Sequence, residues 1–253
     1  MIIDSHCHLS DLDNLPEIME RAKQNRVSLI LNIGTSFDDI AANEKIAETY
    51  ANVRLACGIH PEYANDNVDF DADNLTKHLH HPKVIALGEI GLDYYYNADS
   101  REKQITMFSR QLDIAAAEKL PVIIHCRDAD DDCQKILAGY KDRITGVLHC
   151  FSGSRALCEF ALAIGFYISA SGIITFKNAQ DLRDIFADVP TNRLLVETDA
   201  PYLAPHPLRG KTNEPSFIVH TMECLARVKN TDAEHLEPII TENFFNLFTK
   251  AKI

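Results

Sequence analysis

The sequence predicts a single (β/α)8 barrel, an α/β fold of the TIM type, with a metal site at the carboxyl-terminal rim of its strands. Short apolar runs alternate with longer amphipathic stretches, there are eight such runs, and the chain has 253 residues. Runs that are apolar on both faces suit a buried parallel sheet, and strands that alternate with helices indicate βαβ units. Eight units in roughly 250 residues match one barrel, so we expect one domain over residues 1–253. A doubly wound open sheet is the alternative.

The eight expected strands are the apolar runs themselves, at residues 2–3, 28–33, 53–59, 84–88, 122–124, 146–148, 166–169 and 194–196. Helical periodicity fills most of the intervals between them, as at residues 15–22 and 108–115. The longest uncharged run covers residues 160–176, but glycine and hydroxyl residues interrupt it. It is too short to span a membrane, so it predicts a helix end, a turn and a buried strand. Residues 236–248 are apolar at helical spacing and predict a closing helix.

The composition is that of a globular protein, with 46% hydrophobic and 25% charged residues, which excludes a disordered or low-complexity chain. The formal net charge of −12 argues against a sequence-independent DNA coat. An enzyme acting on phosphates would therefore need metal ions or a local basic patch. Seven cysteines without C-x-x-C spacing, and a start without a basic or apolar leader, predict reduced thiols in a cytoplasmic protein.

Side chains that bind metals follow five of the apolar runs. The candidates are His6, His8, Glu89, His125, His149 and Asp199. In a parallel barrel the carboxyl ends of all strands lie on one rim, so these six side chains converge there. His6 and His8 are two residues apart, and an extended strand points both to the same face. A second histidine cluster, at residues 78–81, lies at an expected helix end, where the same spacing shares no face. We expect that cluster to be solvated and inert.

Six ligands exceed the needs of one tetrahedral ion and fit two divalent ions that share a carboxylate. The expected arrangement places His6, His8 and Asp199 on one ion and His125 and His149 on the other, with Glu89 as the bridge. Nitrogen and oxygen ligands without thiolate admit zinc, manganese or magnesium. Two such ions activate a water molecule for hydrolysis and stabilise the attacking and leaving oxygens.

Several neighbouring residues are candidates for supporting roles. Asp4 and Glu197 share strand faces with His6 and Asp199, respectively, and we expect both to orient metal ligands by hydrogen bonding. The cysteines that neighbour ligands, at positions 7, 126 and 150, are expected to point outward into the helix layer. Four residues are candidates for binding substrate phosphates: His60, Arg127, Arg209 and Lys211.

Seven stretches, spread over nearly the whole chain, carry a resemblance to the TatD family of metal-dependent hydrolases. They are IDSHCHL at 3–9, GIHP at 58–61, ALGEIGLDYYY at 86–96, HCRDA at 125–129, LHCFSG at 148–153, VETDAPYLAP at 196–205 and RGKTNEP at 209–215. Two departures are Ser10, where the family often has Asp or Asn, and Cys126, where Thr or Ser is common. Neither departure removes a ligand.

The resemblance implies a two-metal barrel enzyme in which the same six residues are ligands. It further implies a deoxyribonuclease, often a 3′ to 5′ exonuclease on single-stranded DNA. Glu89 and Asp199 would be the catalytic residues, with Asp199 also handling the proton. DNA is then the substrate, with no membrane and no obligate protein partner.

Two other functions stay open. The same metals could polarise a carbonyl in a small amide, ester or lactone. Related barrels often bridge their ions with a carboxylated lysine on the fourth strand, and residues 86–89 offer no lysine, which favours the phosphodiesterase. A binding module without activity is the third reading, and it would be expected to have lost ligands, whereas none is missing.

Overall fold

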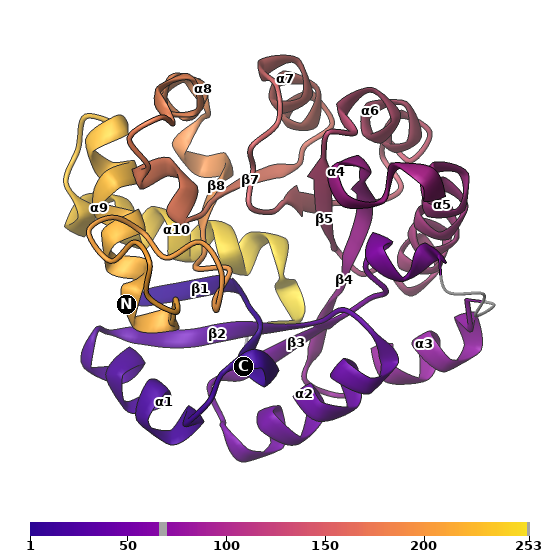
Figure 1. Ribbon diagram of the computed structural model, residues 1–253, viewed down its shortest axis with the longest axis horizontal. Helices are drawn as coiled ribbons and strands as arrows, with labels where there is room; N and C mark the ends of the chain where they lie inside the picture. The colour runs from indigo at the N-terminus through magenta and orange to yellow at the C-terminus, as the bar shows by residue number, and fades with distance from the viewer. Residues whose placement is uncertain (66–69, 252–253) are drawn as a thin grey trace.

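The computed structural model describes residues 1–65 and 70–251. Eight strands form one parallel sheet in sequential order, with helices around it (Figure 1). The strands are β1 (Ile2–Cys7), β2 (Val27–Gly34), β3 (Val53–Cys57), β4 (Val84–Asp93), β5 (Val122–Arg127), β6 (Gly146–Leu148), β7 (Tyr167–Ala170) and β8 (Leu194–Val196). The predicted (β/α)8 barrel is confirmed.

The helices alternate with the strands, and two additional helices interrupt or follow this alternation. They are α1 (Leu15–Gln24), α2 (Phe37–Thr49), α3 (Ala72–Leu79), α4 (Tyr94–Asn97), α5 (Arg101–Glu118), α6 (Asp130–Ala138), α7 (Arg155–Ala163), α8 (Gln180–Asp188), α9 (Ile218–Val228) and α10 (Ala233–Leu247). The short α4 follows β4 directly and turns the chain toward α5. Among the described residues, no helix combines the length and apolar character that crossing a bilayer requires.

The barrel closes between its first and last strands. Cys7 and Ala200 form a parallel bridge just beyond the end of β8. The backbone N–H of His8 donates to the carbonyl of Ala200 at 2.8 Å, and the N–H of Asp199 donates to the carbonyl of His6 at 3.0 Å. The closing hydrogen bonds therefore involve three candidate ligands, which fixes the two ends of the chain of strands at the rim.

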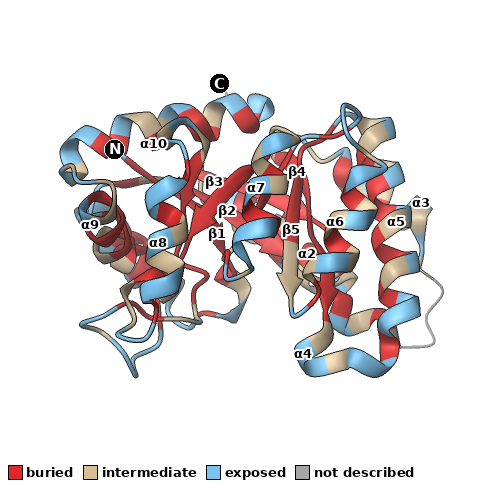
Figure 2. Ribbon diagram, turned by 90° about the horizontal axis from the view of Figure 1, so that it is seen from above, coloured by how far each residue is buried: buried red, intermediate tan, exposed pale blue. Residues whose placement is uncertain are grey.

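Side-chain alternation along the strands creates two hydrophobic layers. Ile3, Leu31, Ile123 and Leu195 point into the barrel and belong to one buried cluster with Phe244 of α10. The alternate strand positions pack against the surrounding helices, whose inward faces are buried and outward faces exposed (Figure 2). The predicted closing helix is thus α10, which covers the barrel interior, and the rim with the polar side chains stays open.

Candidate metal centre

The six candidate ligands come from distant parts of the sequence and meet at one end of the barrel. His6, Glu89 and His125 lie on β1, β4 and β5, whereas the other three follow the ends of β1, β6 and β8. Except for His6, which is fully buried, all of them line one cavity of about 610 Å³. The sequence prediction that they converge at the rim therefore agrees with the geometry.

Glu89 lies at the centre of this group, between two pairs of imidazoles. Its Oε2 is 3.3 Å from Nε2 of His6 and 3.8 Å from Nε2 of His8. Its Oε1 is 2.6 Å from Nε2 of His149 and 2.9 Å from Nδ1 of His125. Each carboxylate oxygen thus faces its own pair of ring nitrogens, which is the arrangement that a bridging carboxylate needs.

Asp199 adds a second carboxylate on the side of the first pair. Its Oδ1 lies 3.7 Å from Nε2 of His6 and 3.6 Å from Nε2 of His8. Its backbone is left-handed, with φ of 59°, so the chain turns sharply at this position directly after the barrel closes. Nitrogen and carboxylate donors at these spacings fit a borderline divalent ion such as zinc or manganese.

The donors fall into three overlapping groups, each close enough to share one ion. The groups are His6, His8 and Glu89; His6, His149 and Asp199; and His60, Glu89 and His125. This partition differs from the expected one in two respects. His149 stacks on His6 with ring centroids 3.9 Å apart, so it is shared between the two sides. His60, expected to bind substrate, has Nε2 3.6 Å from Oε1 of Glu89, so it is also close enough to this group to contact an ion.

A glycine lets β4 carry Glu89 into the centre. Gly91 has φ of +143°, and a Cβ built on it would lie 1.9 Å from the carbonyl oxygen of His125. Only glycine permits this close approach of β4 to β5. The apolar run ends at Gly88, but the strand continues to Asp93, so Glu89 lies within β4 and not at its end as expected. The local register of β4 with β5 is irregular between Leu87 and Ile90.

The charge states in the cluster follow from burial and close contacts. Burial raises the pKa of Glu89, but the charges of His149, His60 and His6 outweigh burial and hold that pKa well below its usual range. Burial lowers the pKa of His8, yet hydrogen bonding to Asp199 and the charge of Glu89 raise it to about 9. The carboxylate of Glu89 is therefore ionised at neutral pH and available as a ligand.

Polar groups behind the ligands orient them. Asp93 Oδ2 lies 3.0 Å from Nε2 of His125, so an Nε2–H donor leaves Nδ1 facing Glu89. Glu197 accepts a hydrogen bond from the backbone of Cys150 at 2.6 Å and lies 3.4 Å from Nδ1 of His149. Glu197 also accepts a hydrogen bond from the hydroxyl of Ser169 on the neighbouring strand β7 at 2.6 Å, so it lies beside the candidate ligand His149 and not beside Asp199.

Asp4 supports the closing segment more than it supports His6. Its carboxylate accepts hydrogen bonds from the backbone N–H of Thr198 at 2.9 Å and from the Thr198 hydroxyl at 2.6 Å. Its contact with the backbone N–H of His6 is longer, at 3.4 Å. Burial raises the pKa of Asp4 to about 7 against these hydrogen bonds. Asp4 therefore holds the segment that leads from β8 to Asp199.

The four candidate phosphate-binding residues divide into two pairs. His60 and Arg127 line the cavity of the ligand cluster. Arg209 and Lys211 are not among the residues that line it. Arg209 lies over the ring of Phe176, at 3.9 Å from its centroid, and donates to the carbonyl of Ala204 at 3.1 Å. The structure thus brings only His60 and Arg127 to the ligands.

The cysteines that neighbour candidate ligands do not all point in the predicted direction. Cys7 is buried in the layer between strands and helices, as expected. Cys150 lines the ligand cavity, so its predicted outward direction is wrong. The reason is that β6 ends at Leu148 and Cys150 adopts φ of 43°, which breaks the strand alternation.

The second histidine cluster, at residues 78–81, is not simply solvated as expected. His78 pairs with Glu44 of α2 at 2.8 Å, and His80 pairs with Glu118 of α5 at 3.0 Å.

The site residues predicted from the sequence do not include two tyrosines, on α4 and on the loop after β8, that line the same cavity. Tyr96 and Tyr202 line the ligand cavity, and Tyr202 meets His8 edge to face at 6.0 Å. Asp93 lines this cavity as well, and it is not among the site residues predicted from the sequence. The signal for it was an Asp directly before a run of three tyrosines, a position typical of a helix N-cap.

The fold and this cluster of buried imidazoles and carboxylates at an open barrel rim define the class: a metal-dependent hydrolase. The family described as TatD related DNase matches residues 3–249. The uncharacterized metal-dependent hydrolase YcfH of Escherichia coli is 39% identical, with 98% of this chain and 95% of that protein covered. The uncharacterized metal-dependent hydrolase YabD of Bacillus subtilis is 38% identical, with 98% and 99% covered.

A solved structure of a TatD homologue is similar to this protein over its whole length. The crystal structure of YJJV, a TatD homologue from Escherichia coli, superposes with a TM-score of 0.92 at 30% identity, covering 98% of both chains. The chain therefore belongs to the TatD family of metal-dependent hydrolases, as its motifs predicted.

Proposed function

We propose that this protein is a deoxyribonuclease that hydrolyses phosphodiester bonds at the 3′ end of single-stranded DNA with two divalent metal ions. The observation that carries the proposal is the placement of Glu89, each of whose carboxylate oxygens faces a separate pair of imidazoles at an open rim. The family described as TatD related DNase supports the choice of DNA.

The ions would be held by His6, His8, Glu89, His125, His149 and Asp199, and zinc, manganese and magnesium are the candidate metals. When bound, such ions lower the pKa of water and stabilise negative charge on a phosphoryl group. The two carboxylates supply negative charge for the ions, and the hydrogen bond between His125 and Asp93 fixes the orientation of one imidazole.

The carboxylate of Asp199 is the group we assign as proton acceptor. Burial raises the pKa of this carboxyl, but hydrogen bonding to His8 and the charges of His6 and His149 lower it overall. The carboxylate is therefore ionised at neutral pH and accepts a proton from the attacking water at the cavity. Arg127 and His60 line the same cavity and would orient the phosphate there.

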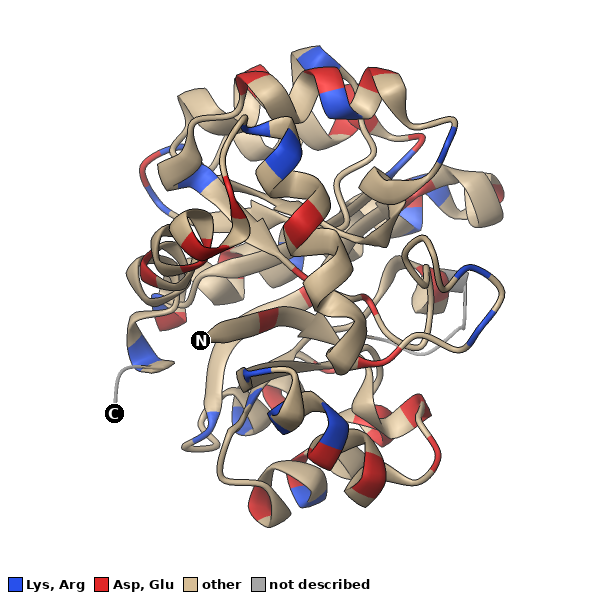
Figure 3. Cartoon of the chain, turned by 90° about the vertical axis from the view of Figure 1, so that its left-hand side faces the viewer, with Lys and Arg blue, Asp and Glu red and all other residues tan. Residues whose placement is uncertain are grey.

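The surface favours a strand end over a duplex. On the side drawn in Figure 3, positions of Lys and Arg are interspersed with those of Asp and Glu among the described residues, and the net charge of the chain is −12. Affinity for duplex DNA rests largely on neutralising phosphates with basic side chains. A single strand that inserts its end into the cavity needs less of that neutralisation. The seven cysteines are all free, which is consistent with a cytoplasmic location.

The test is a metal-reconstitution assay. Protein stripped with a chelator is reloaded separately with zinc, manganese or magnesium and assayed on 5′-labelled single strands, on circular single strands, and on small esters, lactones and amides. We expect stepwise shortening from the 3′ end and no cleavage of circles. Turnover of the carbonyl compounds alone would replace this proposal with the small-molecule hydrolase, and cleavage of circles would refute the exonuclease mode.

A further inference from the structure

A pair of exposed tyrosines stands beside the ligand cavity. Tyr95 and Tyr96, on the short helix α4, are 59% and 69% exposed, which is unusual for large aromatic rings. Their rings are perpendicular, with centroids 4.8 Å apart. Exposed aromatic side chains that gather at one place on a soluble protein commonly mark a binding surface.

Arg127 of β5 fixes the geometry of this pair. Its guanidinium carbon lies 4.0 Å from the ring centroid of Tyr95 and 4.7 Å from that of Tyr96. Contacts at these distances are favourable cation–π interactions. Tyr95 stays largely exposed although Arg127 covers part of its ring. We call these three side chains, Tyr95, Tyr96 and Arg127, the aromatic platform.

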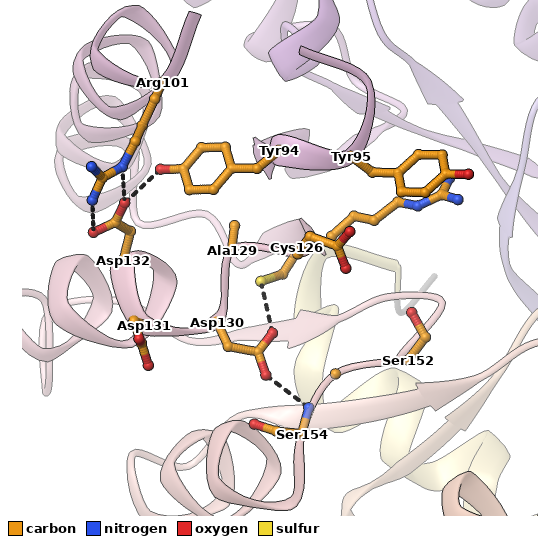
Figure 4. Close-up of a pocket in the computed structure, with 13 residues that line it drawn as sticks. Tyr94, Tyr95, Arg101, Cys126, Ala129, Asp130, Asp131, Asp132, Ser152 and Ser154 are labelled. Atoms are coloured by element: carbon orange, nitrogen blue, oxygen red, sulfur yellow. Dashed lines mark hydrogen bonds and ion pairs between the residues drawn. The ribbon is translucent and has the colours of Figure 1, made fainter. Parts of the chain in front are cut away.

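The aromatic platform separates two cavities. Tyr96 and Arg127 line the ligand cavity, whereas Tyr95 and Arg127 line a second one of about 800 Å³, the side cavity (Figure 4). Cys126 and Ser152 also line both, so the two cavities adjoin each other. A molecule bound at the candidate metal centre can therefore extend past Arg127 into the side cavity.

Asp93 links the aromatic platform to the candidate ligands. Its Oδ1 accepts hydrogen bonds from the backbone N–H groups of Tyr95 at 3.0 Å and Tyr96 at 2.9 Å. Its Oδ2 lies 3.0 Å from Nε2 of His125. One carboxylate thus positions a metal ligand and both tyrosines, so the distance from the aromatic platform to the reacting phosphate is fixed by the fold.

The lining of the side cavity indicates what it accepts. Asp128 and Asp131 are exposed there, and Asp130 lies beside them, whereas the charge of Asp132 is neutralised by Arg101 at 2.7 Å. These carboxylates repel phosphate groups, so the sugar–phosphate backbone is disfavoured inside. An uncharged planar group can stack on the ring of Tyr95 and is not repelled by the carboxylates on the other side of the side cavity. Nucleobases have this character, and stacking on aromatic side chains tolerates every base.

We propose that the aromatic platform stacks the base of a nucleotide that flanks the scissile phosphodiester, and that the side cavity accommodates this base. The inference rests on the proposed nuclease function and extends it by assigning a base-binding subsite. The protein then cleaves a phosphodiester faster when a base lies at this subsite, because part of the binding free energy comes from the stacked base. A single-stranded end provides such an unpaired base, whereas a base within a duplex is already stacked.

The experiment pairs protein variants with modified substrates. The metal-loaded protein and its Tyr95→Ala and Tyr96→Ala variants are assayed on a single-stranded DNA 10-mer. Two further 10-mers carry an abasic tetrahydrofuran residue at the terminal or the penultimate 3′ nucleotide. Loss of one stacking contact corresponds to a fall in kcat/KM of about 5- to 160-fold, expressed mainly in KM. We expect each alanine variant to show this fall on the normal 10-mer.

The abasic substrates separate stacking from a structural effect. At one of the two positions, loss of the base should lower the kcat/KM of the wild-type protein by a similar factor. On that abasic substrate, the alanine variants should have the same kcat/KM as the wild-type protein. Tyr95→Phe, which keeps the ring, should retain wild-type kcat/KM. Tyr140→Ala removes a ring that lies against Arg143, at 4.9 Å, beyond the other end of α6, and should also leave kcat/KM unchanged.

Equal losses for the alanine variants on normal and abasic substrates would overturn the base-binding subsite while leaving the nuclease function intact. Unchanged kcat/KM in both alanine variants would overturn it as well. If the wild-type protein cleaves none of the three DNA substrates with any metal, the proposed function fails and this inference fails with it.

Discussion

Replacement of Glu89 by glutamine is the sharpest perturbation of the candidate metal centre. The substitution keeps the size of the side chain but removes its charge and converts one carboxylate oxygen into an NH2 group. In the native site the two oxygens approach His149 Nε2 at 2.6 Å and His6 Nε2 at 3.3 Å. An NH2 group binds no cation, so the glutamine can serve only one side of the centre.

The size of the effect follows from this geometry. We expect the protein to retain at most one of two ions, because the shared ligand is lost on one side. Charge stabilisation by a metal ion is worth several kcal/mol in the transition state, and about 4 kcal/mol corresponds to a fall in rate of roughly 10³-fold. The folded state should persist, since Gln is nearly isosteric and carries no buried charge.

The assay measures metal content by mass spectrometry after exhaustive dialysis, together with kcat/KM on single-stranded DNA. Glu44→Gln is the matched control, because Glu44 also pairs with an imidazole, that of His78 at 2.8 Å, but lies on the helix layer. This control should keep both its metal content and its activity. Two ions and wild-type turnover in Glu89→Gln would refute the bridging role.

Three further predictions concern the surroundings of the site. The substitution Asp93→Asn keeps an oxygen that can cap α4 but removes the charge facing His125. Metal affinity should therefore fall about 10- to 100-fold with little change in Tm. An unchanged metal affinity would show that Asp93 does not position His125. Gly91→Ala should unfold the protein or lower its Tm strongly, because the added Cβ would collide with the carbonyl of His125; a wild-type Tm would contradict this. Burial raises the pKa of Glu214, but the hydrogen bonds from Arg21 and Ser216 and the charge of Arg21 together outweigh burial and lower this pKa overall. The stability that Glu214 contributes is thus present above its unfolded-state pKa of about 4.3 and is lost as pH falls through the lowered pKa. Glu214→Gln should therefore destabilise the protein by about 1 kcal/mol at pH 7 and by less near pH 3 in denaturant titrations, whereas a pH-independent difference would argue against the ion pair.

Local patterns explain why the fold could be predicted from the sequence. Strands that are apolar on both faces, such as β2 and β8, leave a continuous signal because both of their faces are buried. The spacing of His6 and His8 correctly predicted that their imidazoles lie together, 3.2 Å apart at Nε2, because strand alternation depends only on neighbouring residues. The convergence of the six candidate ligands follows from the rule that parallel strands of a barrel end on one rim.

What could not be predicted depends on contacts between distant segments or on unusual backbone angles. The strand β4 extends past its apolar run because it pairs with β5 through Gly91, and no local pattern shows that pairing. Cys150 points into the cavity because its φ is positive, which is uncommon for a non-glycine residue. Arg209 packs on Phe176, more than 30 positions away in sequence, and the charge of a loop residue does not indicate such a partner.

Anomalous diffraction from crystals of the zinc- or manganese-loaded protein tests the central claim most directly. The account predicts two peaks, one on each side of the Glu89 carboxylate, with imidazole nitrogens of His6 and His8 near one and of His125 near the other. A map with no peak among these side chains, or with the ions bound elsewhere on the barrel, would contradict it.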